Sequence, residues 1–423
     1  MALDAQSNWN VEMPQRLKPS ISQDTVNSPS DVSGPPSPKS SSPIPHHRDA
    51  SREILLPTEI ITQILSYLPR RAPSQSTFYS CSLVSRAWYS AAVTFLYERP
   101  YLTGGNFNSF VQTVCPSKNA HIRKSPLSIL VKRLDMSALV HNSSRSLTAR
   151  LLGRLKGNIE EFVAPQSSFG INSFAALSKC TKLHFLDLSL ISASISNRLL
   201  FQALKSLEDL EILFFPRSSS RDERDLEDSI PYIWPPKLKA LHLAGGVDDY
   251  FLTTHLANLP SCVEKLSIQH CSQVHGSPLR VALGRIGPQL QHLTIRHPMP
   301  RLAPGDLDYL LSQCPKLIAL RVSADYITLG NLFINCDFPH HLRILDLDAS
   351  SSYTPDLAPT AAHLYFQVEE GRFPDLRSVR VSSRLGWYED SASKIDVSDL
   401  QEVMEDHDSE VPLGIPTGVW KVD

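Results

Sequence analysis

Large apolar residues recur along most of the chain in the pattern apolar-x-x-apolar-x-apolar. Side chains alternate between the two faces of a strand, so the final spaced pair of each copy predicts a short strand with one buried face. Including a weaker copy at Ile159-Phe162-Ala164, the ten copies are Val131-Leu134-Met136, Ile159-Phe162-Ala164, Leu183-Leu186-Leu188, Leu207-Leu210-Ile212, Leu238-Leu241-Leu243, Val263-Leu266-Ile268, Leu290-Leu293-Ile295, Leu317-Leu320-Val322, Leu342-Leu345-Leu347 and Leu376-Val379-Val381.

The copies follow one another at nearly constant spacing, with steps of 28, 24, 24, 31, 25, 27, 27, 25 and 34 residues between their first positions. Between them, apolar residues return at helical spacing, as in 197–204 and 306–315. Each unit is therefore expected to form one strand and one helix. A single unit cannot cover its own apolar face, whereas stacked units can, so the pattern predicts a solenoid with parallel strands on one side. The alternative is an ordinary α/β domain with leucine-rich strands.

The x positions beside each strand's apolar residues should face away from the core and form a concave surface. For the early units the pattern places Phe185, Asp187, Ser189, Asp209, Glu211, Leu213, Ala240, His242 and Ala244 there. Further along it places Lys265, His292, Arg296 and Arg321 on adjacent strands, with acidic residues again in the late units. These four residues predict a basic strip that holds an acidic or phosphorylated segment of a protein substrate. The alternative is that the charges only keep the surface soluble.

A separate helical segment precedes the repeats, at 54–96. Pro57 suits the first turn of a helix, and Ile60, Ile61, Ile64, Leu65 and Leu68 follow at helical spacing. Apolar residues around Phe78 and from Trp88 to Leu96 predict two more short helices. A piece this small is marginal as a free domain, because it buries too little surface to offset chain entropy.

The segment resembles the F-box. The resemblance rests on Leu56-Pro57-x-Glu59-Ile60, Ile64-Leu65-x-x-Leu68-Pro69 and Leu83-Val84-Ser85-Arg86-x-Trp88, in that order. The link between Leu68 and Leu83 departs from the family pattern and leaves the start of the second helix open. The resemblance implies docking on a Skp-type adaptor, and through it on a cullin-RING ligase, by Leu56, Pro57, Ile60, Ile64, Leu65, Leu68, Leu83, Val84 and Trp88. A helical cap without a partner is the alternative.

Residues 125–385 resemble the leucine-rich-repeat family, whose repeats have 20 to 29 residues. Cys180, Cys271 and Cys314 stand at unit edges, as in the cysteine-containing repeats common in F-box proteins. The resemblance implies an α/β fold in which a three-helix F-box precedes a horseshoe-shaped solenoid with parallel strands on its concave face.

The chain is expected to have four parts, of which composition indicates the first and the last. Residues 1–50 hold ten Ser and eight Pro and should be disordered. The F-box is expected at 52–98 and the solenoid at 99–386. Residues 387–423 are expected to be a solvated acidic tail, since 389–410 contains nine Asp or Glu and one Lys.

The charge balance excludes several classes of partner. With 41 Lys and Arg against 43 Asp and Glu, the formal net charge of −2 offers no general attraction to nucleic acid or to an anionic membrane.

No apolar run of about 18 residues is present, and the N-terminus lacks the pattern of a signal peptide. The seven cysteines are odd in number, which favours reduced thiols and a cytoplasmic or nuclear protein.

Motifs for catalysis or cofactor binding are missing. The sequence contains no P-loop, no dinucleotide-binding G-x-G-x-x-G after a strand and no G-x-S-x-G elbow. Cys262, His270, Cys271 and His275 lack the paired spacing of zinc ligands. We therefore expect no catalytic residue, no metal and no cofactor.

The resemblance to the F-box and leucine-rich-repeat families implies a substrate-recognition subunit of an SCF-type ubiquitin ligase. A scaffold or regulator that binds the adaptor without ligase function is the second interpretation. An enzyme on a repeat scaffold is the third, and the missing motifs disfavour it.

Overall fold

The computed structural model describes residues 56–70, 72–117, 125–139, 144–220, 231–328, 331–334, 339–353 and 359–422, which belong to one compact unit, Leu56–Asp423. The Ser/Pro-rich segment 1–50 lies outside the described residues. None of the described helices is long and apolar enough to span a membrane.

Three helices open the unit: α1 (Thr58–Ser66), α2 (Ala72–Ser82) and α3 (Arg86–Glu98). Pro57 is the N-cap of α1, and the Ser85 side chain caps α3 by accepting a hydrogen bond from Trp88 N. The second helix, whose start the sequence left open, begins at Ala72 and has Pro73 in its first turn. The helices enclose a small core of their own, made by Ile61, Leu65, Phe78, Ala91 and Ala92.

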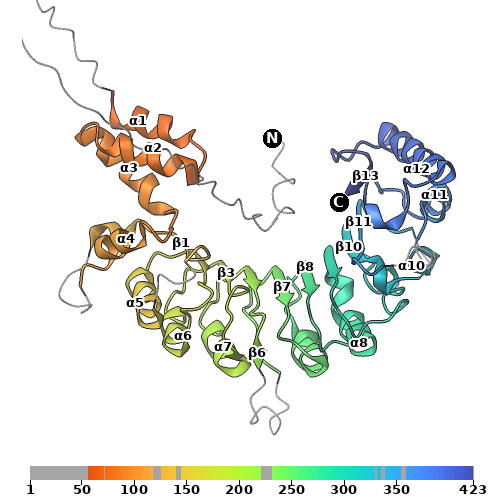
Figure 1. The fold of residues 1–423 in the computed structure, drawn as a ribbon, viewed down its shortest axis with the longest axis horizontal. Coiled ribbons are helices and arrows are strands. Elements are labelled where there is room, and N and C mark those ends of the chain that lie inside the picture. Colours follow the sequence, from red (N-terminus) through yellow and green to blue (C-terminus); the bar gives the residue numbers. More distant parts are fainter. Residues whose placement is uncertain are drawn as a thin grey trace, which may run out of the picture. The chain divides into compact units, whose positions relative to one another are not determined.

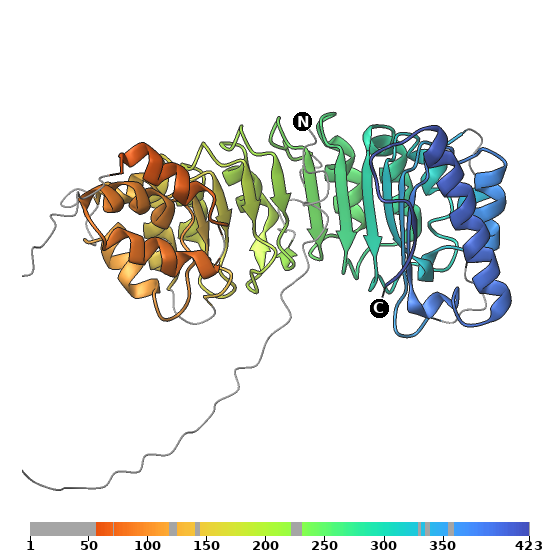
Figure 2. The same cartoon turned by 90° about the horizontal axis from the view of Figure 1, so that it is seen from above.

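Behind the helices, parallel strands form one continuous sheet along the inner side of an arc, with helices along its outer side (Figures 1 and 2). In order, its strands are β1 (Arg133–Asp135), β2 (Glu161–Val163), β3 (Phe185–Asp187), β5 (Ile212–Phe214), β7 (Ala240–Ala244), β8 (Lys265–Gln269), β9 (His292–Arg296), β10 (Ala319–Ser323), β11 (Ile344–Asp348), β12 (Ser378–Ser382) and β13 (Gly418–Val422). A second small sheet pairs β4 (Ile195–Ser196) with β6 (Ser219–Ser220).

Most connections between strands contain a helix, as the repeat predicts. The α-helices are α4 (Phe107–Val114), α5 (Arg145–Leu155), α6 (Ile171–Leu177), α7 (Asn197–Leu204), α8 (Gly276–Ile286), α9 (Leu310–Gln313), α10 (Asn331–Ile334), α11 (Ala361–Glu369) and α12 (Ser391–Glu410). Between β7 and β8 a π-helical turn, Phe251–His255, and a 3₁₀ turn, Leu256–Asn258, take the helix position.

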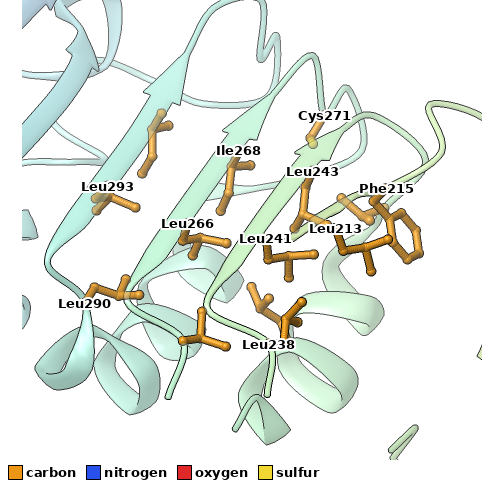
Figure 3. Close-up of a cluster of buried hydrophobic side chains, with 14 of the residues drawn as sticks. Leu213, Phe215, Leu238, Leu241, Leu243, Leu266, Ile268, Cys271, Leu290 and Leu293 are labelled. Atoms are coloured by element: carbon orange, nitrogen blue, oxygen red, sulfur yellow. The ribbon is translucent and has the colours of Figure 1, made fainter. Parts of the chain in front are cut away.

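The repeated apolar residues form the core between strands and helices. Figure 3 shows this for the central units, where Leu241, Leu243, Leu266 and Ile268 project from one side of the sheet toward the helices. Because neighbouring strands pair in register, equivalent residues stack in rows, as Leu241 with Leu266 and Leu266 with Leu293. Each row joins one unit to the next, which is how stacked units cover the face that one alone exposes.

One unit differs in register from the sequence prediction. Its strand is β5, and the buried triplet is Leu210, Leu213 and Phe215 (Figure 3) rather than Leu207-Leu210-Ile212. Two overlapping copies of the pattern exist here, three residues apart, and Leu207 is buried as well, so the sequence alone did not separate them. The concave residues of this unit are therefore Ile212 and Phe214, and the placement of Asp209, Glu211 and Leu213 there was wrong.

The acidic C-terminal segment is folded, which corrects the expectation of a solvated tail at 387–423. Helix α12 packs against α11 and buries Val397, Leu400 and Met404, and β13 pairs in parallel with β12 as the last strand of the sheet. These three residues form an apolar stripe at helical spacing among the acidic residues. The stripe, and not the net charge, decides the fold of this segment.

Candidate functional site

Helix α1 carries two apolar stripes that point in different directions. Ile61 and Leu65 are each 1% exposed and lie in the core of the three-helix unit. Ile60 and Ile64 are 43% and 45% exposed. Residues four apart share one face of a helix, so α1 uses one stripe to fold and presents the other to solvent.

The turn between α2 and α3 adds further apolar surface. Leu83 and Val84 belong to neither helix and are 68% and 66% exposed. Leu56 and Pro57, just before α1, are also exposed. Monomeric proteins rarely leave this much apolar surface uncovered within one small unit unless it contacts a partner.

The remaining residues of the predicted adaptor set face the interior in part or in full. Leu65 lies in the core and is 1% exposed, so in this structure it has no free surface, and its adaptor contact stays a prediction. Leu68 and Trp88 are partly buried and pack against the same core. The exposed tyrosines Tyr67, Tyr79 and Tyr89 were not in the predicted set, because Tyr67 stands at an x position of the second motif and the other two lie outside the motifs.

Ion pairs join the three-helix unit to the first strands. Glu161 of β2 accepts hydrogen bonds at 2.7 Å from Arg99, just after α3, and at 2.7 Å from Arg133 of β1. Glu98, at the end of α3, pairs with Arg70 at 2.8 Å. A polar cavity of about 330 Å³ lies here, lined by Arg70, Arg99 and Arg133 among others, and each of these arginines is paired with a carboxylate.

The four residues of the predicted basic strip do lie on adjacent concave strands, but two of them are neutralised within the chain. Arg296 pairs with Asp348 of β11, and Arg321 pairs with Asp346 of the same strand at 3.0 Å. Burial raises the pKa of Asp346, whereas the neighbouring Arg321 opposes that rise. The sequence could not show these pairs, because their members stand on different repeats.

The other two members of the strip differ in charge. His292 is neutral at physiological pH, since burial, aided by Lys265, lowers its pKa to about 4. Lys265 has no ion-pair partner in the described part of the chain. The concave face thus presents one uncompensated cation at this place and not a basic strip.

The described cysteines are thiols, and most of them are buried. Burial raises the pKa of Cys180 to about 12, of Cys271 to about 11 and of Cys314 to about 12, so these thiols stay protonated and weakly nucleophilic. Cys262, His270 and His275 form no metal-binding group, and no cluster of three or more His, Cys, Asp or Glu within the described ranges is arranged to hold a metal ion.

Comparison with known proteins gives matches of two kinds. Residues 54–103 match the F-box-like family. The crystal structure of the leucine-rich repeat-containing protein LegL7 from Legionella pneumophila has 12% sequence identity and a TM-score of 0.33, over 63% of this chain and 97% of that one. A score this low carries no weight, and the assignment below rests on the sequence relatives and on the fold described above.

Two yeast proteins are similar over most of their length. The F-box protein YDR306C of Saccharomyces cerevisiae is 31% identical over 383 residues, covering 86% of this chain and 77% of the yeast protein. The protein pof5 of Schizosaccharomyces pombe is 30% identical over 329 residues, covering 78% of this chain and 89% of pof5. With its three-helix segment and its repeat solenoid, the chain belongs to the F-box proteins with leucine-rich repeats.

Proposed function

We propose that this chain is the substrate-recognition subunit of an SCF-type ubiquitin ligase. Its F-box docks on a Skp-type adaptor, and through it on a cullin-RING ligase, while the solenoid holds a protein target. Catalysis then belongs to other subunits, and this chain contributes by holding the target near the transferred ubiquitin. The buried, protonated thiols support a role without a catalytic cysteine.

The observation that carries the proposal is the exposed apolar surface on α1 and the α2–α3 turn, defined here as the docking surface: Leu56, Pro57, Ile60, Ile64, Leu83 and Val84. It belongs to the segment that matches the F-box-like family, at 54–103. Since the core of the three-helix unit forms without these side chains, their exposed apolar surface is best explained by a partner. Reduced thiols on the described chain support a cytoplasmic or nuclear location.

Adaptor binding is tested with purified full-length chain and a recombinant Skp-type adaptor. Substituting Ile64→Glu or Leu83→Glu should weaken binding by about a hundredfold, because a charge replaces an apolar contact at the centre of the surface. Gln63→Glu is the matched control, since Gln63 is exposed on the same helix next to Ile64. Equal adaptor binding by wild type and both surface variants would overturn the docking proposal.

Ligase function is tested by affinity capture from cells with the proteasome blocked. Proteins captured by both wild type and Ile64→Glu, and whose levels rise when the variant replaces wild type in cells with an active proteasome, are the expected substrates. Capture of adaptor without cullin, together with unchanged protein levels, would instead favour an adaptor-binding scaffold.

A further inference from the structure

Three aromatic rings lie in a row on the concave face of the sheet, on the neighbouring strands β3, β5 and β7. The Phe214 ring of β5 lies 4.0 Å from the His242 ring of β7, with 4° between their planes. Phe185 of β3 lies 5.6 Å from Phe214 on the other side. Ile212 pairs in register with Phe185 and extends the same apolar surface. Phe185, Ile212, Phe214 and His242 are defined here as the aromatic shelf.

The shelf is not needed for the core of the solenoid. The same strands bury Leu186, Leu213 and Leu241 on the opposite, helix-facing side, where each is fully covered. The members of the shelf are only half-buried, on the side where no described helix packs. Large aromatic side chains on the open face of a sheet supply rigid contact area at low entropic cost, which is a property of binding surfaces.

Charge lies at both edges of the shelf and beside its middle, where Asp187 of β3 pairs in register with Phe214 and accepts hydrogen bonds from Ser189. At one edge the Arg133 guanidinium lies 5.9 Å from the centre of the Phe185 ring, and it is already paired with Glu161 and Asp135. At the other edge Lys265 pairs in register with Ala240, two residues before His242, and has no ionic partner among the described residues. The shelf therefore ends at one available positive charge.

His242 adds hydrogen-bonding capacity without charge. Burial, with a smaller effect of Lys265, lowers its pKa to about 4, so the ring is neutral at physiological pH. A neutral imidazole has one N–H donor and one acceptor nitrogen. None of the described side chains or backbone groups forms a hydrogen bond with this ring, so both nitrogens remain for a bound chain.

We infer that the aromatic shelf and Lys265 are the part of the concave face that binds the target, and that they select an extended peptide segment with a large apolar side chain and a nearby carboxylate. The apolar side chain covers Phe214 and His242, and the carboxylate pairs with Lys265. Since Lys265 is a diagonal neighbour of His242, one strand across and two residues along, about 7–8 Å away, the acidic residue should stand within about two positions of the apolar one. This inference rests on the proposed function and adds the class of substrate.

The inference is tested with a phage-displayed library of random peptides, selected on the purified full-length chain. We expect enrichment of peptides that combine an aromatic or large aliphatic residue with a nearby Asp or Glu. A synthetic peptide of the enriched sequence should bind Phe214→Ala about tenfold or more weakly than wild type. Arg380→Ala is the control, because Arg380 is exposed in the same middle row of concave residues on β12, and it should bind like wild type.

A charge-reversal variant tests whether a loss of peptide binding is caused by a loss of the fold. Selection on Lys265→Glu should enrich peptides with Lys or Arg in place of the acidic residue, which an unfolded variant would not do. Failure to enrich any such peptide on wild type, or equal peptide binding by wild type and Phe214→Ala, would overturn the inference.

Adaptor binding is measured in parallel on the same proteins. All shelf variants should bind the adaptor like wild type, because the docking surface is unchanged. Loss of peptide binding with adaptor binding intact tests the shelf alone, whereas a wild-type chain that binds the peptide and not the adaptor would contradict the proposed function and leave the shelf standing.

Discussion

The guanidinium of Arg377 is 1% exposed, and its Nε donates a hydrogen bond at 3.1 Å to Asp408 of α12. Its other nitrogens donate to backbone carbonyls, including His407 O at 3.0 Å and Val411 O at 3.2 Å. The last carbonyls of a helix lack partners within the helix, and a cation nearby also complements the helix dipole. Arg377, just before β12, therefore fixes the C-terminal end of α12 to the sheet.

Arg377→Ala should lower the free energy of unfolding by about 3 kcal/mol, because it leaves Asp408 and several carbonyls without their donor. Chemical denaturation followed by circular dichroism measures this. Arg372→Ala is the control: Arg372 is only partly buried and pairs with exposed Glu370, so its loss should cost less than about 1 kcal/mol. A similar effect of the two substitutions would contradict the role assigned to Arg377.

Deleting residues 389–423 should destabilise the solenoid. The deletion removes α12 with its buried Val397, Leu400 and Met404, and it removes β13 from the edge of β12. Exposing that core should lower the free energy of unfolding by several kcal/mol, on the order of 5. Thermal unfolding and size-exclusion chromatography measure the result; a monomeric protein with unchanged melting would show that this segment is dispensable.

Glu161→Gln should weaken the attachment of the three-helix unit to the first strand. Glu161 is shared by Arg99 and Arg133, and the neutral amide cannot accept both charge-assisted hydrogen bonds equally well. We expect a loss of about 1–2 kcal/mol of unfolding free energy. Glu160→Gln is the matched control, because Glu160 is more exposed and contacts Lys132 at 3.4 Å. Equal losses for the two variants would argue against a special role for Glu161.

Stability should fall with decreasing pH partly because of His242 and His292. Both have a folded-state pKa of about 4, below the ordinary value of 6.5. As the pH falls below about 6.5, the unfolded chain takes up protons that the folded chain does not, so unfolding is favoured progressively until about pH 4. Above about pH 6.5 neither histidine contributes to the slope.

Urea unfolding at about pH 7.5 and about pH 5 tests this for wild type, His242→Gln and His292→Gln. Each variant should lose less stability than wild type between the two pH values, since its amide does not titrate. Parallel pH profiles for wild type and both variants would show that these rings are not held neutral by folding.

The fold was largely predictable because one apolar pattern repeats along the chain at nearly constant spacing. Ten copies of one apolar pattern specify a parallel solenoid, and most strands lie where the pattern placed them. The error at β5 arose where two copies overlap, since Leu207, Leu210 and Leu213 are all buried. Only the stacking of Leu213 beside Leu186 and Leu241 selects one register, and that contact is between units.

The surfaces were less predictable because they depend on partners distant in sequence. Ile60 and Ile61 are adjacent and chemically identical, yet one is exposed and the other is core. Arg296 and Arg321 form a basic pattern in the sequence, and the carboxylates that neutralise them come from a later strand, β11. Residue type alone does not show what each of these side chains contacts, because the packing of distant segments decides it.

The in-register pairing of β7 to β12 has a consequence for how the open face of such a chain can change over time. Residues that lie side by side on this face, such as Thr294, Arg321 and Asp346, come from three different repeats. A mutation in one repeat therefore changes the side chains of one strand on the open face and leaves those of the neighbouring strands in place. Duplicating a whole repeat would insert one more strand and move the parts of the sheet on either side of it apart by one strand spacing, about 4.8 Å. The open face would then be longer and built from the same kind of repeat.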